Sequence, residues 1–317
     1  MQQVDLLRAR FNGETFWLRP AWRARSRYPR ELLGFHRLMA LRHWDDQVDL
    51  HHVYAPELYR LPILRFLRRP VVYTVTAGVG SARRMPSTAF LQRLRAIVVP
   101  SDTDLGTLTR RGLRNVHLIR PGIDTERFAD SAAPSGPGFV LLSGSAPWTR
   151  GQFSSKGVDA LLEVARRMPD MRLVFLWRGL LLPELLARVR RLALSDRVEI
   201  VSDWIDVGRV LTRVHAAVVL VGQPGLVQAY PHSLLEALAA SRPVLVSGGN
   251  PMAEYVRDTG CGRVVPRLGA SDLLEAIQQL RQDYAVYQAR ASEVGKRDFS
   301  QAEFVAAHRA LYHSLAG

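Results

Sequence analysis

The stretch QAYPHSLLEALAASRPVLV, from Gln228 to Val246, indicates a tight turn, then a helix, then a strand. Pro231 is expected in the first helical turn, where its missing N–H costs nothing because that group has no intrahelical partner anyway. Ser241-Arg242-Pro243 ends the helix before Val244-Leu245-Val246 begins the strand. A helix that leads directly into a short apolar strand is typical of parallel α/β sheets.

The start of this helix also has the chemistry of an anion-binding site. The amides of its first turn should point out of the helix end without partners, and the helix dipole favours a negative charge there. Glu236 follows one turn later, so a ligand with both phosphates and hydroxyls, such as a nucleotide sugar, would suit this end. The alternative is a core helix whose glutamate caps or solvates an end. The amides in question belong to His232, Ser233, Leu234 and Leu235.

Lysine usage singles out a second position. The chain has 41 Arg but only two Lys, Lys156 and Lys296. Lys156 lies just after a predicted strand, Phe139–Ser143, and its Gly-rich loop. A compact ammonium can approach a phosphate where a broad guanidinium does not fit, so Lys156 is a candidate phosphate ligand. The alternative is an ordinary surface lysine.

Length and composition predict a two-domain globular protein. The chain has 317 residues, of which 47% are hydrophobic, enough for two cores. It contains no apolar run of the roughly 18 residues that a membrane span needs, and its first residues do not resemble a signal peptide. The single Cys261 excludes an intramolecular disulfide. We therefore expect a cytoplasmic protein.

The positive charge is concentrated near the N-terminus. Residues 1–100 carry 17 Arg and 7 acidic residues, whereas residues 101–317 carry 26 basic and 22 acidic residues. The excess gathers in Arg19–Arg42, interleaved with aromatic residues, and such a surface could rest on anionic lipid. The alternative is a solvated helix face in an Arg-biased chain. No zinc finger or RNA-recognition motif is present, so nucleic acid is not an expected partner.

Apolar runs alternate with amphipathic stretches along the chain, which predicts parallel sheets covered by helices on both faces. The flexible segment Asp130–Gly138 predicts a linker between domains at 1–133 and 134–317. A last helix, at about residues 301–315, could pack back on the first domain. The expected strands are Val71–Val75, Ala96–Val99, Val116–Ile119, Phe139–Leu142, Leu173–Leu176, Val198–Val201, Ala216–Val221 and Val244–Val246.

Four motifs occur in an order and spacing that resemble the GT-B glycosyltransferases, specifically the large retaining group called family 4. The resemblance covers about residues 47–317. The motifs are Asp49-Leu50-His51-His52; Val98-Val99-Pro100-Ser101 with Ile119-Arg120-Pro121-Gly122-Ile123-Asp124 and Phe128; Lys156-Gly157-Val158-Asp159 with Leu161-Leu162; and the stretch from Gln228 to Glu236 with the apolar pattern behind it.

This resemblance implies two Rossmann-like domains facing a cleft, with the acceptor on the N-terminal side and the nucleotide sugar on the C-terminal side. It implies a retaining, metal-independent transferase that moves a sugar from a nucleotide sugar to a lipid-linked or polysaccharide acceptor. Such an enzyme would act at the inner face of a membrane. The nucleotide sugar would be a substrate, and neither a metal nor a cofactor is expected.

The resemblance also assigns roles to single residues. Lys156 would clamp the diphosphate, and Glu236 would hold the ribose hydroxyls. The family's arginine after the loop glycine is absent, since Ser145 follows Gly144, and Arg150 could replace it. The expected catalytic residues are Lys156, Arg150, Gln228 and Glu236. The expected donor-binding residues are Gly144, Ser145, Lys156, Tyr230, His232, Ser233, Leu234 and Glu236.

Three departures from the family pattern leave other functions open. Gln228 stands where the family has a glutamate that touches the donor sugar, and Thr76 stands where it has a histidine. The chain is also expected to begin near the second strand of the fold, around Val4–Arg8, without the usual first strand, Gly-rich loop and helix. These departures would suit a binding or scaffold protein that has lost the chemistry. A nucleotide-sugar epimerase is a further alternative.

Several acidic and histidine residues are interpreted as structural. Asp102-Thr103-Asp104 resembles the metal-binding Asp-x-Asp of other glycosyltransferases, but it follows Pro100-Ser101 at a predicted helix start, where such residues cap amides. His51 and His52 are expected at the end of a strand, and Asp45-Asp46 in a solvated turn. No metal site is predicted.

Overall fold

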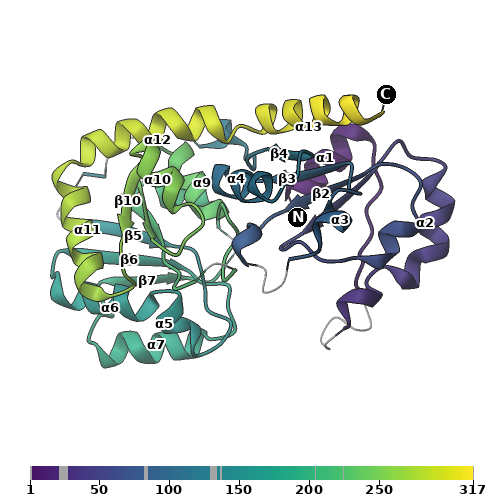
Figure 1. The fold of residues 1–317 in the computed structure, drawn as a ribbon. Helices are drawn as coiled ribbons and strands as arrows, with labels where there is room; N and C mark the ends of the chain where they lie inside the picture. The colour runs from purple at the N-terminus through teal and green to yellow at the C-terminus, as the bar shows by residue number, and fades with distance from the viewer. Residues whose placement is uncertain are drawn as a thin grey trace. The chain divides into compact units, whose positions relative to one another are not determined.

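The structure is a computed structural model that describes residues 2–20, 28–81, 85–128, 134–135, 138–203, 205–223 and 225–316. The chain divides into two compact units, which are shown in Figure 1. The first unit comprises residues 1–122 and 302–317, and the second comprises residues 123–301. Most of the expected linker, namely residues 130–133 and 136–137, lies outside the described residues. Each unit is an α/β fold with its own parallel sheet.

The first unit is built on a four-stranded parallel sheet in the order β1-β2-β3-β4. Alternate residues of one strand enter different cores: Val72 packs with one apolar cluster, whereas Tyr73 and Val75 pack with another. Because both faces are buried, the strands are nearly continuous apolar runs, as parallel sheets require. The strands are β1 (His51–Ala55), β2 (Val71–Val75), β3 (Ala96–Val99) and β4 (Val116–Leu118).

Helices cover both faces of this sheet. Leu7 of α1 and Phe304 and Leu311 of α13 pack on one face, and Leu41 of α2 and Leu108 of α4 pack on the other. The α-helices are α1 (Gln2–Phe11), α2 (Leu38–Asp45), α3 (Thr88–Leu91), α4 (Asp102–Arg110) and α13 (Gln301–Ala316), and the 3-10 turns are η2 (Arg30–Leu32), η3 (Phe35–Arg37), η4 (Pro62–Phe66) and η5 (Val79–Ser81).

The second unit has a six-stranded parallel sheet in the order β10-β9-β8-β5-β6-β7. The strand order reverses between β5 and β8, because β5 continues to β6 on one side and pairs with β8 on the other. In open α/β sheets, ligands bind at the carboxyl ends of the strands beside such a switch point. The strands are β5 (Phe139–Ser143), β6 (Met171–Leu176), β7 (Val198–Val201), β8 (Ala216–Val219), β9 (Val244–Ser247) and β10 (Gly262–Val265).

The helices of the second unit fall on the two faces of its sheet. Helices α6, α7 and α11 pack on one face, and α8, α9, α10 and α12 pack on the other. The helical elements are η6 (Thr125–Arg127), α5 (Gln152–Ser155), α6 (Val158–Arg167), α7 (Leu182–Arg191), α8 (Val207–Leu211), α9 (His232–Ala239), α10 (Ala253–Thr259), α11 (Ala270–Gln282) and α12 (Tyr284–Asp298). Within the described ranges, no helix has the length and apolarity needed to cross a bilayer.

The structure differs from the sequence predictions at several elements. Residues 4–8 lie in helix α1, not in a strand, because Val4, Leu7 and Phe11 recur at helical spacing and Leu7 is buried. His51 begins strand β1 and does not end one, since the buried residues of that strand, Val53 and Ala55, follow it. Strand β10 was not expected at all.

The two units also meet at a different place in the chain from the predicted domain boundary at residue 133, since the second unit begins at residue 123. Residues 123–128 belong to the second unit, where the amide of Ile123 donates to Phe299 O at 2.8 Å and the amide of Gln301 donates to Ile123 O at 2.9 Å. The remainder of helix α13, from Ala302 onward, belongs to the first unit.

Candidate donor-binding site

The loop after β5 packs directly on the start of helix α9. A Cβ added to Gly144 would lie 2.9 Å from Cβ of Ser233, closer than real Cβ atoms approach other atoms, and 3.1 Å from its Oγ. Only glycine therefore lets this loop reach the helix end. The two elements follow β5 and β8, the strands beside the switch point, so both lie where an α/β sheet places its ligands.

The Lys156 ammonium lies at the same loop. Its Nζ donates a hydrogen bond to Ala146 O at 3.1 Å, two residues after Gly144. The side chain is 6% exposed, and this burial lowers the pKa of Lys156 below its ordinary value. An ammonium has three donors, so one carbonyl leaves capacity for an anionic ligand. Lys156 and Ser233 thus border one short stretch of loop, residues 144–146.

Gly157 fixes the backbone next to this lysine. It has φ 68°, in the left-handed region, and a Cβ there would lie 2.6 Å from the side chain of Leu220, just beyond β8. Nearby, the amide of Gly222 donates to Ser155 O at 2.8 Å. These contacts join the loop after β8 to the turn that carries Lys156.

The start of α9 offers fewer open amides than the sequence indicated. Pro231 is the N-cap, not the first helical residue, with φ −62° and ψ 129°. Its carbonyl accepts hydrogen bonds from the amides of Leu234 at 2.9 Å and Leu235 at 3.2 Å, so the prediction that these two amides lack partners was wrong. Among the described residues, the amides of His232 and Ser233 have no hydrogen-bond partner. The candidate anion cup is therefore made of two amides, not four.

Glu236 lies one turn into α9 and is partly buried. Burial raises the pKa of Glu236 to about 7, and the charges of Arg127 and Arg178 counteract part of that shift. Arg127 comes from η6, where it also lies 3.4 Å from Asp206, and Arg178 comes from the loop after β6. A carboxyl that is ready to ionise near neutral pH, with two guanidinium groups close by, is suited to accept hydroxyl hydrogen bonds.

The other expected residues have different surroundings. Arg150 is an exposed residue whose guanidinium lies 3.6 Å from Glu184 of α7. Gln228 is exposed on the loop before α9, whereas Tyr230 is 3% exposed and its ring packs against Phe299 at 5.7 Å. Any contact of Tyr230 with a donor would therefore come from its backbone.

Ser145 and His232 are both half-buried, and burial lowers the pKa of His232. Thr76 belongs to the first unit, where its amide donates to Ala55 O at 2.9 Å. Thr76 and the residues named above therefore lie in different units of the chain.

Three contributors near the site were not expected from the sequence. Arg127 and Arg178 lie beside Glu236 although no pattern marks them. Ser247 Oγ contacts both the amide and the carbonyl of Val221 at 2.7 Å, which holds the loop after β8 in place. The Gly-rich run that follows Ser247, Gly248-Gly249-Asn250, is the signal that could have revealed this last contact.

The Asp102-Thr103-Asp104 motif makes structural contacts at the start of α4, whereas Asp45, expected in a solvated turn, is 3% exposed. Ser101 caps α4 by accepting the amide of Asp104, and Asp104 in turn accepts the amide of Val79 at 2.9 Å. Asp102 pairs with Arg120 at 2.7 Å. Within the described ranges, no group of three histidine, cysteine or acidic side chains is placed to hold a metal ion.

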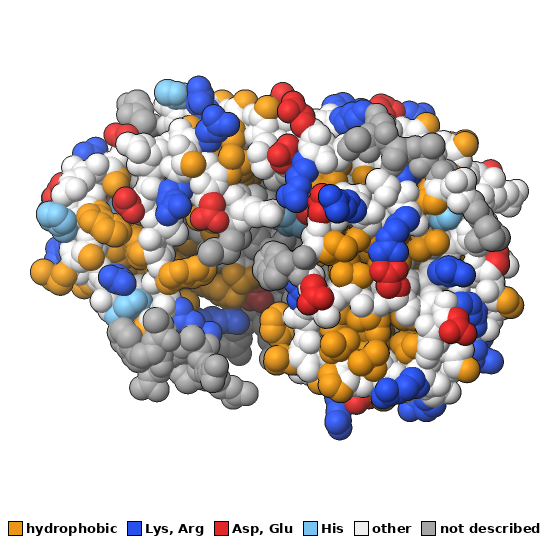
Figure 2. All heavy atoms as spheres, turned by 180° about the vertical axis from the view of Figure 1, so that it is seen from behind, with side chains coloured by type: hydrophobic (Ala, Val, Ile, Leu, Met, Phe, Trp, Pro, Cys, Tyr) orange, Lys and Arg blue, Asp and Glu red, His pale blue; other side chains and the backbone are white. Residues whose placement is uncertain are grey.

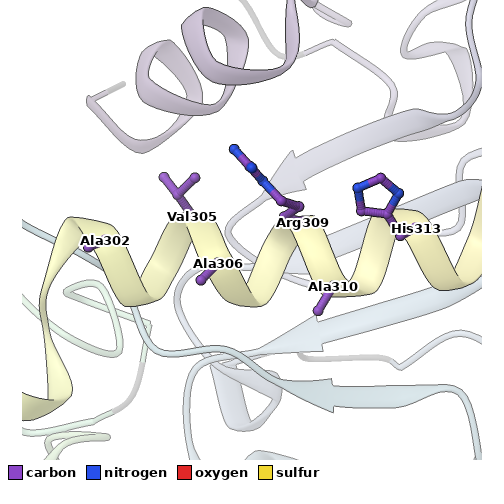
Figure 3. Close-up of a pocket in the computed structure, with 6 residues that line it drawn as sticks. All are labelled: Ala302, Val305, Ala306, Arg309, Ala310 and His313. Atoms are coloured by element: carbon purple, nitrogen blue, oxygen red, sulfur yellow. The ribbon is translucent and has the colours of Figure 1, made fainter.

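A surface hollow of about 420 Å³ lies elsewhere, on helix α13 of the first unit. Figure 3 shows its lining side chains along that one helix. None of the expected donor-site residues lines it. The lining residues are Ala302, Val305, Ala306, Arg309, Ala310 and His313.

Comparison with solved structures shows a shared fold at low sequence identity. HepE of Anabaena, solved with UDP and glucose, is 16% identical, with a TM-score of 0.67 over 88% of this chain and 81% of that one. Sucrose-phosphate synthase of Thermosynechococcus elongatus is 19% identical, with a TM-score of 0.68 over 92% and 80%. WaaG, a glycosyltransferase involved in lipopolysaccharide biosynthesis, is 16% identical, with a TM-score of 0.62 over 92% and 85%.

No curated protein sequence matches this chain significantly. The fold that the neighbours share is GT-B, as the sequence predicted. The model of the family described as glycosyl transferases group 1 matches residues 134–298, which is just over half of the chain and nearly all of the second unit. The chain therefore belongs to the glycosyl transferases group 1 family.

Proposed function

We propose that the protein is a retaining, metal-independent glycosyltransferase that moves a sugar from a nucleotide sugar to a lipid-linked or polysaccharide acceptor. The acceptor would be used at the inner face of a membrane. The family and the GT-B fold support a sugar transferase. The finer assignments rest on the chemistry of the site in the second unit.

One observation carries the proposal: Lys156 and the start of α9 border the same loop at the switch point of the sheet. A diphosphate there would receive hydrogen bonds from the ammonium and from the amides of His232 and Ser233. The ribose hydroxyls would donate to Glu236. A buried, fixed cation and oriented amides interact with a developing charge more strongly than mobile groups in water do.

These groups would stabilise the transition state of glycosyl transfer. Breaking the sugar–phosphate bond builds negative charge on the leaving phosphate and positive, oxocarbenium-like character on the sugar. Lys156 and the two amides would take up the phosphate charge without a metal. Retention would follow from attack on the face that the phosphate leaves, with the leaving phosphate accepting the proton of the acceptor hydroxyl.

Two structural neighbours guide the choice of substrates to test. HepE has been solved with UDP-glucose, so UDP-sugars are the first donors to assay. WaaG is involved in lipopolysaccharide biosynthesis, so lipid-linked saccharides are the first acceptors. GDP- and ADP-sugars and soluble oligosaccharides complete the panel.

The test is transfer of a labelled sugar by the full-length protein, with the anomeric configuration of the product read by NMR and the assay repeated in EDTA. We expect transfer with retained configuration and an unchanged rate in EDTA. Inversion would overturn the proposed mechanism, and loss of activity in EDTA would overturn metal independence. Absence of any turnover, together with no nucleotide binding, would overturn the function itself.

The same assays separate the two alternatives that Gln228 and Thr76 leave open. A scaffold protein would release no sugar, and the Gln228→Glu variant, with or without Thr76→His, would gain nothing. An epimerase would convert its nucleotide sugar without any acceptor. For a transferase, Gln228→Glu should raise turnover, because the added charge favours an oxocarbenium-like centre.

A further inference from the structure

Large apolar side chains are exposed beside arginines on the first unit. Trp17 is 67% exposed, Leu32 48%, Met39 79% and Phe66 44%. In a folded domain, large apolar side chains that gather on one surface mark an interaction site more often than isolated ones do. We call these four residues, together with the exposed arginines among them, the apolar–basic surface. Its arginines are Arg19, Arg30, Arg37 and Arg42.

Contacts around Gly34 bring distant parts of this surface together. The amide of Gly34 donates to Leu18 O at 2.7 Å, which places Trp17 beside the turn that contains Leu32. The side chain of Ile63 also packs within 3.3 Å of the Cβ position of Gly34. Phe66, three residues after Ile63, lies with its ring 6.0 Å from that of Phe35.

The exposed side chains alternate with buried ones, so the surface rests on an ordered core. Phe16 and Leu18 pack into the first unit, whereas Trp17 between them points outward. In the same way, Leu38 of α2 packs on the core while Met39 is exposed. The fold therefore does not need these outward side chains for its own burial. Figure 2 shows hydrophobic side chains exposed at several places on the face seen from behind, with basic and acidic side chains among them.

The charge in this segment is almost entirely positive. Residues 17–42 contain seven Arg and one acidic residue, Glu31. Arg23, Arg25 and Arg27 lie outside the described residues and are not part of the defined surface. Arg30 of this surface lies 3.6 Å from Glu57 and stacks on Tyr59, and its side chain is still 60% exposed.

From this combination we infer that the apolar–basic surface docks the protein on an anionic lipid bilayer. The arginines would lie among the acidic headgroups, and the apolar side chains would enter the boundary between headgroups and acyl chains. Nucleic acid fits less well, because the aliphatic Leu32 and Met39 gain nothing from stacking on bases. The inference deepens the proposed function, since docking would bring the enzyme to a lipid-linked acceptor, but docking itself involves no sugar transfer.

The test is co-flotation of the full-length protein with lipid vesicles. We expect binding to vesicles that contain phosphatidylglycerol and little binding to pure phosphatidylcholine. Raising the salt concentration from about 0.1 M to about 1 M should weaken binding, because the Debye length falls from about 10 Å to about 3 Å. Equal binding to both lipids, or no binding to either, would overturn the inference whether or not the protein transfers sugar.

Two variants with matched changes locate the docking surface. The first, Trp17→Ser with Arg37→Gln, Met39→Ser and Arg42→Gln, removes two apolar side chains and two charges from the apolar–basic surface. The control, Leu186→Ser with Arg190→Gln, Arg191→Gln and Val286→Ser, makes the same changes at exposed positions of α7 and α12. We expect at least a roughly 25-fold loss of partitioning in the first variant, about five-fold per charge, and close to the wild-type value in the control.

A single substitution, Met39→Glu, provides a second test that remains valid if the first variant does not fold. Met39→Glu places an acidic residue in the first turn of α2, where the helix dipole favours it, so the fold should be kept. We expect roughly ten-fold weaker partitioning with an unchanged melting temperature. Wild-type partitioning of Met39→Glu, or equal losses in the two multiple variants, would overturn the assignment of this surface. Self-association that depends on these residues, without vesicle binding, would identify a second copy as the occupant and overturn it as well.

Discussion

Both units are parallel α/β folds, and each buries a charged side chain near its sheet, Asp45 in the first and Lys156 in the second, but the two side chains have different sets of partners. In the first unit, the buried Asp45 accepts from the backbone amides of Arg68 at 2.8 Å and Arg69 at 3.2 Å and contacts His51 at 2.8 Å. In the second unit, the ammonium of the buried Lys156 has three donors, and one carbonyl, Ala146 O, accepts from it among the described residues. Polar groups that are satisfied internally hold a fold together, whereas polar groups with spare capacity at strand ends are available to a ligand.

The largest loss of stability is expected when the carboxylate of Asp45 is removed. Asp45→Ala would leave two backbone amides without their acceptor, and each such loss costs about 1–3 kcal/mol. We expect the free energy of unfolding to fall by about 2–4 kcal/mol in urea melts. Asp46→Ala is the control, because that side chain is 71% exposed and pairs loosely with Arg68. Equal losses in both variants would contradict the structural role of Asp45.

This stabilisation should depend on pH in a defined direction. Burial alone would raise the pKa of Asp45, but hydrogen bonds from the Arg68 and Arg69 amides and from His51 outweigh it and lower that pKa below its ordinary value. The contribution is therefore present above the ordinary range of a carboxyl, at about pH 4, and is lost as the pH falls through the lowered value. The difference in stability between wild type and Asp45→Ala should shrink below about pH 4.

Removal of the Lys156 ammonium tests whether the buried charge of the second unit serves a ligand and not the stability of the fold. A charge-assisted hydrogen bond is worth about 1.5–3 kcal/mol, so Lys156→Met should lower kcat/KM for the donor by about 10- to 100-fold. Stability should change little, because a buried charge is exchanged for an apolar group of similar length. Lys296→Met on α12, the only other lysine, is the control and should keep wild-type activity. Unaltered donor use in Lys156→Met would remove the basis of the proposed diphosphate clamp.

Glu236 offers a test in which stability and function change in opposite directions. Because burial raises the pKa of Glu236 to about 7, the folded state holds its proton more tightly than the unfolded chain, and stability falls as the pH rises from about 4.5 to about 7. After allowance for solvent screening, Glu236→Gln should be more stable than wild type by about 1–2 kcal/mol at pH 8 and equal to it near pH 4.5.

The same variant should bind nucleotides more weakly, since an amide accepts hydroxyl hydrogen bonds without a charge. Thermal melts at the two pH values, with and without a nucleoside diphosphate, measure both effects. A loss of stability at pH 8 would mean that Glu236 has a purely structural role.

The smallest expected effect concerns Arg150. Its ion pair with Glu184 is exposed, and such pairs contribute about 0–1 kcal/mol, so Arg150→Ala should shift stability by less than about 0.5 kcal/mol. If Arg150 also assists the donor phosphate, kcat/KM should fall by a few-fold, less than in Lys156→Met. A stability loss comparable to that of Asp45→Ala would contradict this ranking.

Local patterns predicted the parts of the fold that continuous apolar runs encode. Strands β2 and β3 coincide with the expected ranges, because a parallel sheet buried on both faces is built from nearly continuous, mostly β-branched apolar runs. Strand β10, with the sequence GRVV, was missed since it is short and contains an arginine that hydrogen-bonds with Gln279. The strand expected around residues 4–8 is instead part of helix α1, in which Val4, Leu7 and Phe11 follow a helical period.

Long-range contacts could not be predicted in the same way. Asp45 looked like part of a solvated turn, but its partners lie 6 to 24 residues away, and no local rule connects them. The start of helix α9 was predicted in place but with too many open amides, because the N-cap role of Pro231 depends on its own backbone angles. Arg127 and Arg178 approach Glu236 only after η6 and the loop after β6 are folded.

The most direct test of the diphosphate site is an NMR titration of the isotope-labelled protein with UDP and, in parallel, GDP. If Lys156 and the start of α9 bind the diphosphate, the amide signals of His232 and Ser233 should shift more than those of Leu234 and Leu235, whose hydrogens are already donated to Pro231. The shifts should weaken in Lys156→Met. Shifts that leave residues 232–233 and 144–146 unchanged and appear elsewhere in the chain would contradict the account.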